Sequence, residues 1–226
     1  MPEKRKTSKN RKAARPEGKA SAAKASRPNG KEFDLYYYFS VVIHPVFFAV
    51  FVLLSFFLRP TMASQLPHAA ELIFGIIAFA VIPFSIIYKS WKNNEISLDL
   101  EEREKRTQFF LPWAVIFAVA FAFYAHFNAL SHAALALCFA TIMLVLFFAN
   151  HYSKISWHTT GLSALITALC FSYGTPNELL YLLLLPTVSL ARYKLKAHTL
   201  FQLAAGALLG AIICLASYAI LGAPQA

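Results

Sequence analysis

The sequence predicts an all-α protein, a polytopic bundle of six to seven transmembrane helices. Two features of the composition lead to this class: 58% of the 226 residues are hydrophobic, and only 14% are charged. A third observation is that the apolar residues gather in seven runs, several of them close to the roughly 20 residues that cross a bilayer. A soluble domain of this size has no use for so much apolar surface.

The N-terminal segment differs from the rest of the chain. Residues 1–31 carry eleven Lys and Arg against two Glu, and they are rich in Ala, Ser, Pro and Gly. We therefore predict a disordered basic tail over residues 1–34 and a membrane domain over residues 35–224. A nucleic-acid-binding arm is the alternative, but aromatic residues are not interleaved with these charges, so no nucleic-acid partner is predicted. We expect the tail to lie in the cytoplasm beside anionic lipid headgroups.

Each of the seven apolar runs is a predicted membrane helix. Their approximate ranges are 38–58, 70–88, 109–127, 132–150, 158–173, 178–190 and 198–221. The fifth and sixth runs are short for a full crossing. The three cysteines all lie inside apolar runs, and their spacing indicates neither a disulfide framework nor a metal site.

The basic residues outside the tail predict the orientation. With seven crossings, the segments 89–106, 151–157 and 191–197 lie on the same side as the N-terminus, and only Arg59 lies on the other side. The positive-inside rule places that shared side in the cytoplasm. The chain is therefore predicted to be a multi-pass protein of a bacterial inner (plasma) membrane with a cytoplasmic N-terminus.

The most informative polar segment connects the last two runs, where residues 192–210 read RYKLKAHTLFQLAAGALLG. His198 is followed at four-residue steps by Gln202, Gly206 and Gly210, which share one face of a helix. An imidazole beside basic groups such as Arg192 at a membrane surface suits a phosphate. The alternative is a charged loop followed by an ordinary small-residue packing helix.

Two other polar segments precede helices on the same predicted face of the membrane. Residues 154–160 read KISWHTT and include Ser156 and His158. Residues 99–106 read DLEEREKR and include three basic residues, Arg103, Lys105 and Arg106. Three polar segments at helix ends on one face can converge on a single pocket.

On these residues the chain resembles the type 2 phosphatidic acid phosphatase (PAP2) superfamily, which contains lipid phosphatases and vanadium haloperoxidases. The third motif of that family is Ser-Arg, five residues, His, three residues and Asp, and its spacing is matched by Arg192, His198 and Gln202. The Pro-Ser-Gly-His motif is matched at Ser156 and His158. The first motif, a Lys–Arg–Pro element, has only the basic residues of segment 99–106 as counterparts. The resemblance covers about residues 89–215.

The resemblance implies a membrane phosphatase for lipid phosphate or diphosphate monoesters, with a phospho-histidine intermediate and with no metal or other cofactor. The residue matching the family nucleophile is His198, and the residue matching the acid that protonates the leaving oxygen is His158. The implied phosphate ligands are cationic or neutral donors that neutralise the non-bridging oxygens: Arg192, Arg103, Lys105, Arg106 and Ser156.

Three departures from the family pattern support a second hypothesis. Gln202 stands in place of the aspartate that orients the nucleophile, Trp157 stands in place of glycine, and the lysine of the first motif is absent. In a serine-protease triad, an amide in place of the acid costs roughly 10⁴ in rate. The alternative is therefore a catalytically impaired PAP2-like protein that binds phosphate headgroups or a partner. If the protein is an enzyme, Gln202→Asp is expected to raise its activity.

The remaining histidines are predicted to have structural roles. The dipeptide His44-Pro45 near the first helix indicates a local bend or an interfacial contact rather than a proton relay. His126, His132 and His151 lie near predicted helix ends, where an imidazole can reach water. His68 lies in a loop on the opposite side of the membrane from the predicted site.

Overall fold

The structure is a computed structural model that describes residues 31–60, 64–93, 95–96, 103–174 and 177–223. Most of the predicted basic tail lies outside the described residues. The first helix begins at Lys31, so it includes the last four residues, 31–34, of the segment predicted as the tail.

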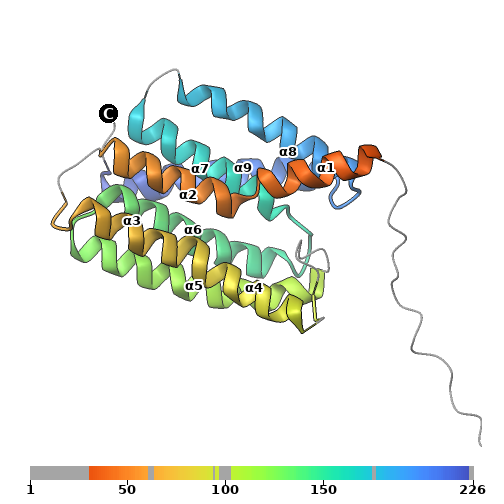
Figure 1. The fold of residues 1–226 in the computed structure, drawn as a ribbon, viewed down its shortest axis with the longest axis horizontal. Coiled ribbons are helices and arrows are strands. Elements are labelled where there is room, and N and C mark those ends of the chain that lie inside the picture. Colours follow the sequence, from red (N-terminus) through yellow and green to blue (C-terminus); the bar gives the residue numbers. More distant parts are fainter. Residues whose placement is uncertain (1–30, 61–63, 94, 97–102, 175–176, 224–226) are drawn as a thin grey trace, which may run out of the picture. The chain divides into compact units, whose positions relative to one another are not determined.

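Within the described residues, the secondary structure is helical (Figure 1). In chain order the elements are α1 (Lys31–Val42), α2 (Pro45–Leu58), α3 (His68–Ile76), the π-helix η1 (Ile77–Val81), α4 (Ile82–Lys92), α5 (Arg103–His126), α6 (Leu130–Ala149), α7 (Trp157–Tyr173), the 3₁₀-helix η2 (Glu178–Leu183), α8 (Leu184–Lys194) and α9 (Leu200–Leu221). The predicted all-α class is confirmed.

Among the described residues, four helical segments are long and apolar enough to cross a membrane. They are the continuous segment His68–Lys92, which joins α3, η1 and α4, and the helices α5, α6 and α9. This supports a membrane protein, while the count of six to seven spans stays a prediction. The first predicted span is divided at His44-Pro45 into α1 and α2.

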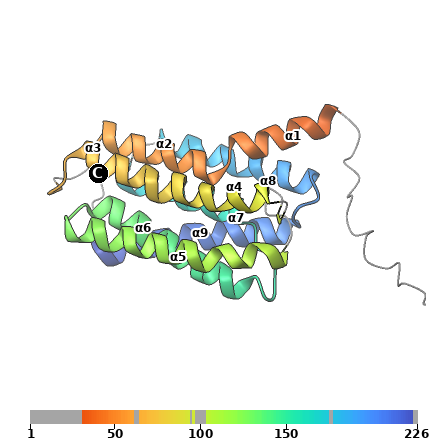
Figure 2. The ribbon, with the colours of Figure 1, turned by 60° about the horizontal axis from the view of Figure 1, so that its bottom comes forward.

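The helix ends next to the three predicted polar segments lie together. The C-terminal ends of α4, α6 and α8 lie at the same end of the bundle as the N-terminal ends of α5, α7 and α9 (Figures 1 and 2). We call this the histidine end, because His158 and His198 lie at it. The other end carries the C-termini of α2, α5, α7 and α9.

Two glycines let α9 lie directly against α7. A Cβ added at Gly206 would collide with the Thr159 side chain and with the Ser156 carbonyl oxygen, and a Cβ added at Gly210 would collide with the Thr160 carbonyl oxygen. Because no side chain separates the two backbones, the first turn of α7 lies beside the first turns of α9. This contact determines where the two predicted catalytic histidines meet.

The α7–α9 contact predicts an unusual response to alanine at position 210. In an exposed helix, Gly→Ala stabilises by up to about 1 kcal/mol, but here the added methyl group meets backbone that cannot rotate away. We expect Gly210→Ala to destabilise the fold by about 1–3 kcal/mol, which lowers the melting temperature by roughly 2–12 °C. Thermal unfolding in detergent measures the shift.

The control is Ala204→Leu, on the exposed face of the same helix. Its melting temperature should stay close to that of the wild type. A Gly210→Ala protein as stable as the wild type would show that the two helices are not in close contact.

Candidate functional site

His198 is held in one tautomer by a backbone carbonyl. It lies just before Thr199, the N-cap of α9, and its Nδ1–H donates to the carbonyl oxygen of Lys154 at 3.0 Å. A carbonyl oxygen can only accept, so the proton of the neutral ring lies on Nδ1 and the lone pair lies on Nε2. The side chain is buried, with 6% of its surface exposed. A nucleophilic imidazole requires this arrangement.

The surroundings also keep this imidazole neutral. Burial, together with the positive charges of Arg192, Lys154 and Arg106, lowers the pKa of His198 from 6.5 to about 3, although the hydrogen bond to the Lys154 carbonyl acts in the opposite direction. A charged ring would lose its hydration and lie beside other cations. At neutral pH the Nε2 lone pair of His198 is therefore available.

Gln202 has a different role from the one that its spacing predicted. Its Oε1 accepts a hydrogen bond from the Thr199 N–H at 3.1 Å, and the Thr199 Oγ1 accepts one from the Gln202 N–H at 3.3 Å. These two bonds form a capping box at the start of α9. The structure thus gives the orienting role to the Lys154 carbonyl and not to Gln202.

His158 lies in the first turn of α7 and is almost completely buried, with 1% of its surface exposed. Neither of its ring nitrogens has a hydrogen-bond partner among the described residues. Electrostatic interactions link the ring to His198, Arg192 and Arg106. Buried polar atoms in native proteins are nearly always paired, so these two nitrogens are open to a hydrogen bond from a ligand or a water molecule.

The first guanidinium of the site comes from α8. Arg192 lies in the last turn of α8 and is buried, with 1% of its surface exposed. Its Nη1 donates to the Oγ of Ser40, a buried residue of α1, at 3.1 Å. α1 packs against α8, which brings these two side chains together. Ser40 belongs to none of the motifs, and no feature of the sequence selects it.

The second guanidinium comes from the first turn of α5. The Nε of Arg106 donates to the Asn150 Oδ1 at 2.7 Å, and its Nη2 donates to the same oxygen. The Asn150 Nδ2 in turn donates to the Arg103 carbonyl oxygen at 2.7 Å and to the Thr107 Oγ1 at 2.5 Å. Because an amide carries no charge, Asn150 fixes Arg106 without neutralising it. Sequence analysis missed Asn150, whose only signal is its position as a polar residue directly after the apolar helix α6.

The side chains of the other predicted phosphate ligands form hydrogen bonds at helix ends or lie exposed on the surface. The Arg103 side chain donates to the carbonyl oxygens of Asn150 and His151 at the C-terminus of α6. Lys105 is exposed. The Ser156 Oγ accepts from the Thr159 N–H at 3.4 Å as the N-cap of α7. The structure therefore brings together four of the predicted residues, and we call them the histidine–arginine cluster: Arg106, His158, Arg192 and His198.

Trp157, which stands where the resemblance expects glycine, packs against neighbouring rings. Its ring centroid lies 5.7 Å from that of Trp113 and 4.8 Å from that of His44. It also lines an apolar cavity between α2, the α3–α4 segment, α5 and α6, together with Pro45 and Phe117. The indole thus forms a boundary between the polar cluster and apolar space.

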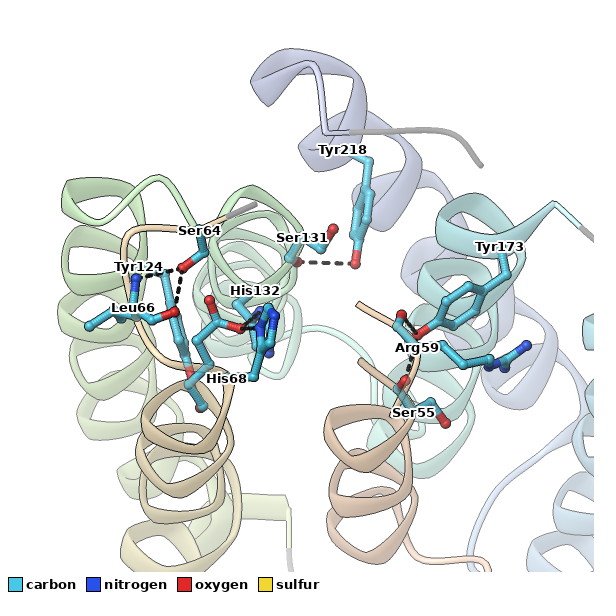
Figure 3. A network of polar contacts seen from close by, with 11 residues as sticks. Ser55, Arg59, Ser64, Leu66, His68, Tyr124, Ser131, His132, Tyr173 and Tyr218 are labelled. Atoms are coloured by element: carbon cyan, nitrogen blue, oxygen red, sulfur yellow. Dashed lines mark hydrogen bonds and ion pairs between the residues drawn. The ribbon is translucent and has the colours of Figure 1, made fainter. Parts of the chain in front are cut away.

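The opposite end of the bundle has a different charge pattern (Figure 3). Its buried acids lie beside basic side chains: Glu178 pairs with Arg59 at 3.0 Å, and the Glu71 Oε2 lies 3.4 Å from the His68 Nδ1 and 3.8 Å from the His132 Nδ1. At this end the guanidinium of Arg59 is paired with a carboxylate, whereas Arg106 in the histidine–arginine cluster is hydrogen-bonded to a neutral amide. His132, predicted to reach water at a helix end, is buried.

Two searches complete the description of the site. Among the described residues, no group of three or more His, Cys, Asp or Glu is arranged to hold a metal ion. No protein-family model, curated protein or solved structure matches the chain. The assignment of function therefore depends on the chemistry of the cluster.

The lowered pKa of His198 predicts a loss of stability in acid. Between pH 6.5 and about 3, the unfolded chain binds a proton at this imidazole and the folded protein does not. The contribution to stability is thus fully present above pH 6.5 and is lost as the pH falls toward 3. In this window acidification should lower the free energy of unfolding by about 1.4 kcal/mol per pH unit.

The variant His198→Asn isolates this contribution, because the asparagine amide lies where the His198 Nδ1 lies and can still donate to the Lys154 carbonyl, but it does not titrate. Unfolding in detergent at several pH values should show a shallower loss of stability for the variant than for the wild type. Parallel stability curves would contradict the assignment of a neutral, buried His198.

Proposed function

We propose that this chain is a multi-pass membrane phosphatase that hydrolyses a phosphate monoester of a lipid through a phospho-histidine intermediate. The observation that carries the proposal is the state of His198: it is buried and neutral, and its proton is fixed on Nδ1 by the Lys154 carbonyl. Two buried guanidinium groups, those of Arg106 and Arg192, act on the same imidazole. A nucleophile for phosphorus and donors for phosphate oxygens are thereby combined in one place.

The first chemical step follows from this geometry. The Nε2 lone pair of His198 forms a bond to phosphorus as the bond from phosphorus to the alcohol oxygen of the lipid breaks. The two guanidinium groups neutralise the non-bridging oxygens as negative charge redistributes. His158 supplies the proton that the leaving oxygen takes up. The negative phosphate of the bound substrate favours an imidazolium at this buried position.

The second step releases the phosphate. Water attacks the phosphorus of phospho-histidine, the phosphorus–Nε2 bond breaks, and the electron pair returns to His198. His158, neutral after the first step, accepts the proton that the attacking water loses. The products are inorganic phosphate and the lipid alcohol, and both histidines return to their starting states.

A lipid substrate is supported by the surroundings of the cluster. Four apolar segments are long enough to cross a membrane, and large apolar side chains such as Val119, Leu208 and Ile212 are exposed on them. Apolar side chains also lie next to the cluster: the ring centroid of Trp157, which lines an apolar cavity, lies 5.2 Å from that of His158. A phosphate bound in the cluster would therefore lie close to apolar groups and to the membrane, where the hydrocarbon chain of a lipid is stable.

The proposal includes a seven-span arrangement with a cytoplasmic N-terminus. In addition to the four long segments, α2, α7 and the η2–α8 segment would complete the crossings, partly shielded by their neighbours. α7 supports this role because nearly all of its residues are buried among other helices. The basic residues around the histidine end would then face the cytoplasm.

The decisive test is release of phosphate from phosphatidic acid, phosphatidylglycerol phosphate and a polyprenyl diphosphate by the purified protein. His198→Gln should reduce turnover by at least about 10³-fold, since it removes the nucleophile. His158→Gln should reduce turnover by about 10²–10⁴-fold. Gln202→Asp should change turnover by less than about threefold, because the Lys154 carbonyl already orients His198.

His126→Gln is the matched control, because this histidine is exposed at the opposite end of the bundle. It should be as active as the wild type. Phosphate binding by the wild type without turnover on any of these lipids would instead favour the binding protein that sequence analysis left as the alternative.

The orientation has its own test. A single cysteine at position 105 or 194, in a background without the native cysteines Cys138, Cys170 and Cys214, should react with a membrane-impermeant thiol reagent only after cells are opened. Both positions are exposed at the histidine end. Labelling in intact cells would place the cluster on the outer side of the membrane.

A further inference from the structure

The turn between α1 and α2 brings a third imidazole to the histidine–arginine cluster. The centroid of the His44 ring lies 4.9 Å from that of His158, and the two rings are perpendicular, with an interplanar angle of 89°. Electrostatic interactions also link His44 to Arg192. The sequence predicted only a local bend or an interfacial contact at His44-Pro45, and the chemistry proposed above does not require His44.

The hydrogen bonding of His44 determines its tautomer. The Val46 N–H donates to the His44 Nδ1 at 3.2 Å, and this bond caps the N-terminus of α2. An imidazole nitrogen accepts a hydrogen bond only when it carries no proton. His44 is therefore neutral, and its proton lies on Nε2. It offers the cluster an uncharged N–H donor.

A close contact between two helices fixes the position of this donor. Pro45 is the first residue of α2, and a Cβ added at Gly161 of α7 would lie only 2.9 Å from the Pro45 Cβ. The start of α2 is thus seated against the first turns of α7, which also carry His158. Trp157 packs edge to face against the His44 ring from the other direction, with the centroids 4.8 Å apart.

We infer that the Nε2–H of His44 is a third donor for the bound phosphate and that it restricts the site to terminal phosphate groups. The inference rests on the phosphate site of the proposed function. A terminal phosphate has three non-bridging oxygens, and Arg106, Arg192 and His44 supply donors from three different elements. In a phosphodiester one of these oxygens is alkylated and accepts poorly, so the His44 N–H would be left unpaired. His44 therefore selects phosphate monoesters over diesters.

Two substitutions separate this role from a structural one. The side-chain amide of asparagine lies where the His44 Nδ1 lies, so His44→Asn keeps the cap of α2 and loses the donor at Nε2. The longer glutamine places an amide N–H near the position of Nε2 and caps helices poorly, so His44→Gln keeps the donor and loses the cap. A donor role and a capping role therefore predict opposite results for the pair.

The measurement is binding of inorganic phosphate and of dimethyl phosphate to the full-length protein in detergent, by calorimetry, together with thermal unfolding. The wild type should bind phosphate and discriminate against dimethyl phosphate. His44→Asn should weaken phosphate binding about tenfold or more and leave the melting temperature unchanged. His44→Gln should bind phosphate within about threefold of the wild type, in keeping with the loss of less than one hydrogen bond, and melt roughly 1–8 °C lower.

The inference is overturned if His44→Asn binds phosphate as the wild type does, if His44→Gln loses as much affinity as His44→Asn, or if the wild type binds neither anion. Because these measurements require no turnover, they distinguish the donor role from the phosphatase proposal. The expected binding pattern without hydrolysis of any lipid phosphate would support the role of His44 and refute the phosphatase.

Discussion

The site depends on the direct contact between the backbones of α7 and α9. Gly206 and Gly210 remove the side chains that would separate the two helices, so the carbonyl groups of the first turn of α7 lie against α9. The Ser156 N–H donates to the Gln202 carbonyl oxygen at 3.3 Å across this contact. The same approach brings the Lys154 carbonyl within 3.0 Å of the His198 Nδ1. One packing constraint therefore fixes the position, the tautomer and the burial of the proposed nucleophile.

The two ends of the bundle bury charge in different ways. At the opposite end, the carboxylates of Glu71 and Glu178 lie beside the basic side chains of His68 and Arg59. In the histidine–arginine cluster, Arg106 is bound by the amide of Asn150. Burying a cation against a neutral partner is costly, because the lost hydration is not repaid by an opposite charge. A bound anion would lower this cost for Arg106, and the proposed phosphate would be such an anion.

The sequence was sufficient to predict the class of the fold and part of the site. The apolar runs predicted helices such as α6 and α9 to within two residues of their observed starts. The motif spacing selected His158, Arg192 and His198, because each lies at a helix end on the same face of the membrane. The partners of these residues could not be predicted: Asn150, Ser40 and His44 come from segments without a motif, and only the packing of helices distant in sequence brings them to the cluster.

The role of the Lys154 carbonyl could not be predicted from the sequence, for a different reason. A backbone carbonyl is present at every position of a chain, so its use as an orienting acceptor leaves no trace in the sequence. The family resemblance assigned the orientation of His198 to Gln202, and the absence of the aspartate predicted a lower catalytic rate. In the structure, Gln202 instead completes the capping box of α9, which fixes the backbone next to His198.

Because the Lys154 carbonyl accepts the His198 hydrogen bond, the presence of Gln202 in place of the family's aspartate has a smaller expected effect on catalysis. An orienting acid contributes a hydrogen bond and a negative charge, and the Lys154 carbonyl contributes only the hydrogen bond. The absent charge would matter most if His198 had to be cationic before the attack, but its lowered pKa keeps it neutral, and an attacking Nε2 needs a neutral ring. The positive charge that develops on His198 during attack is matched by the negative charge of the phosphoryl group bonded to it. An amide at position 202 and a carbonyl at Nδ1 are therefore compatible with the proposed nucleophilic catalysis, in which the guanidinium groups would bind the phosphate.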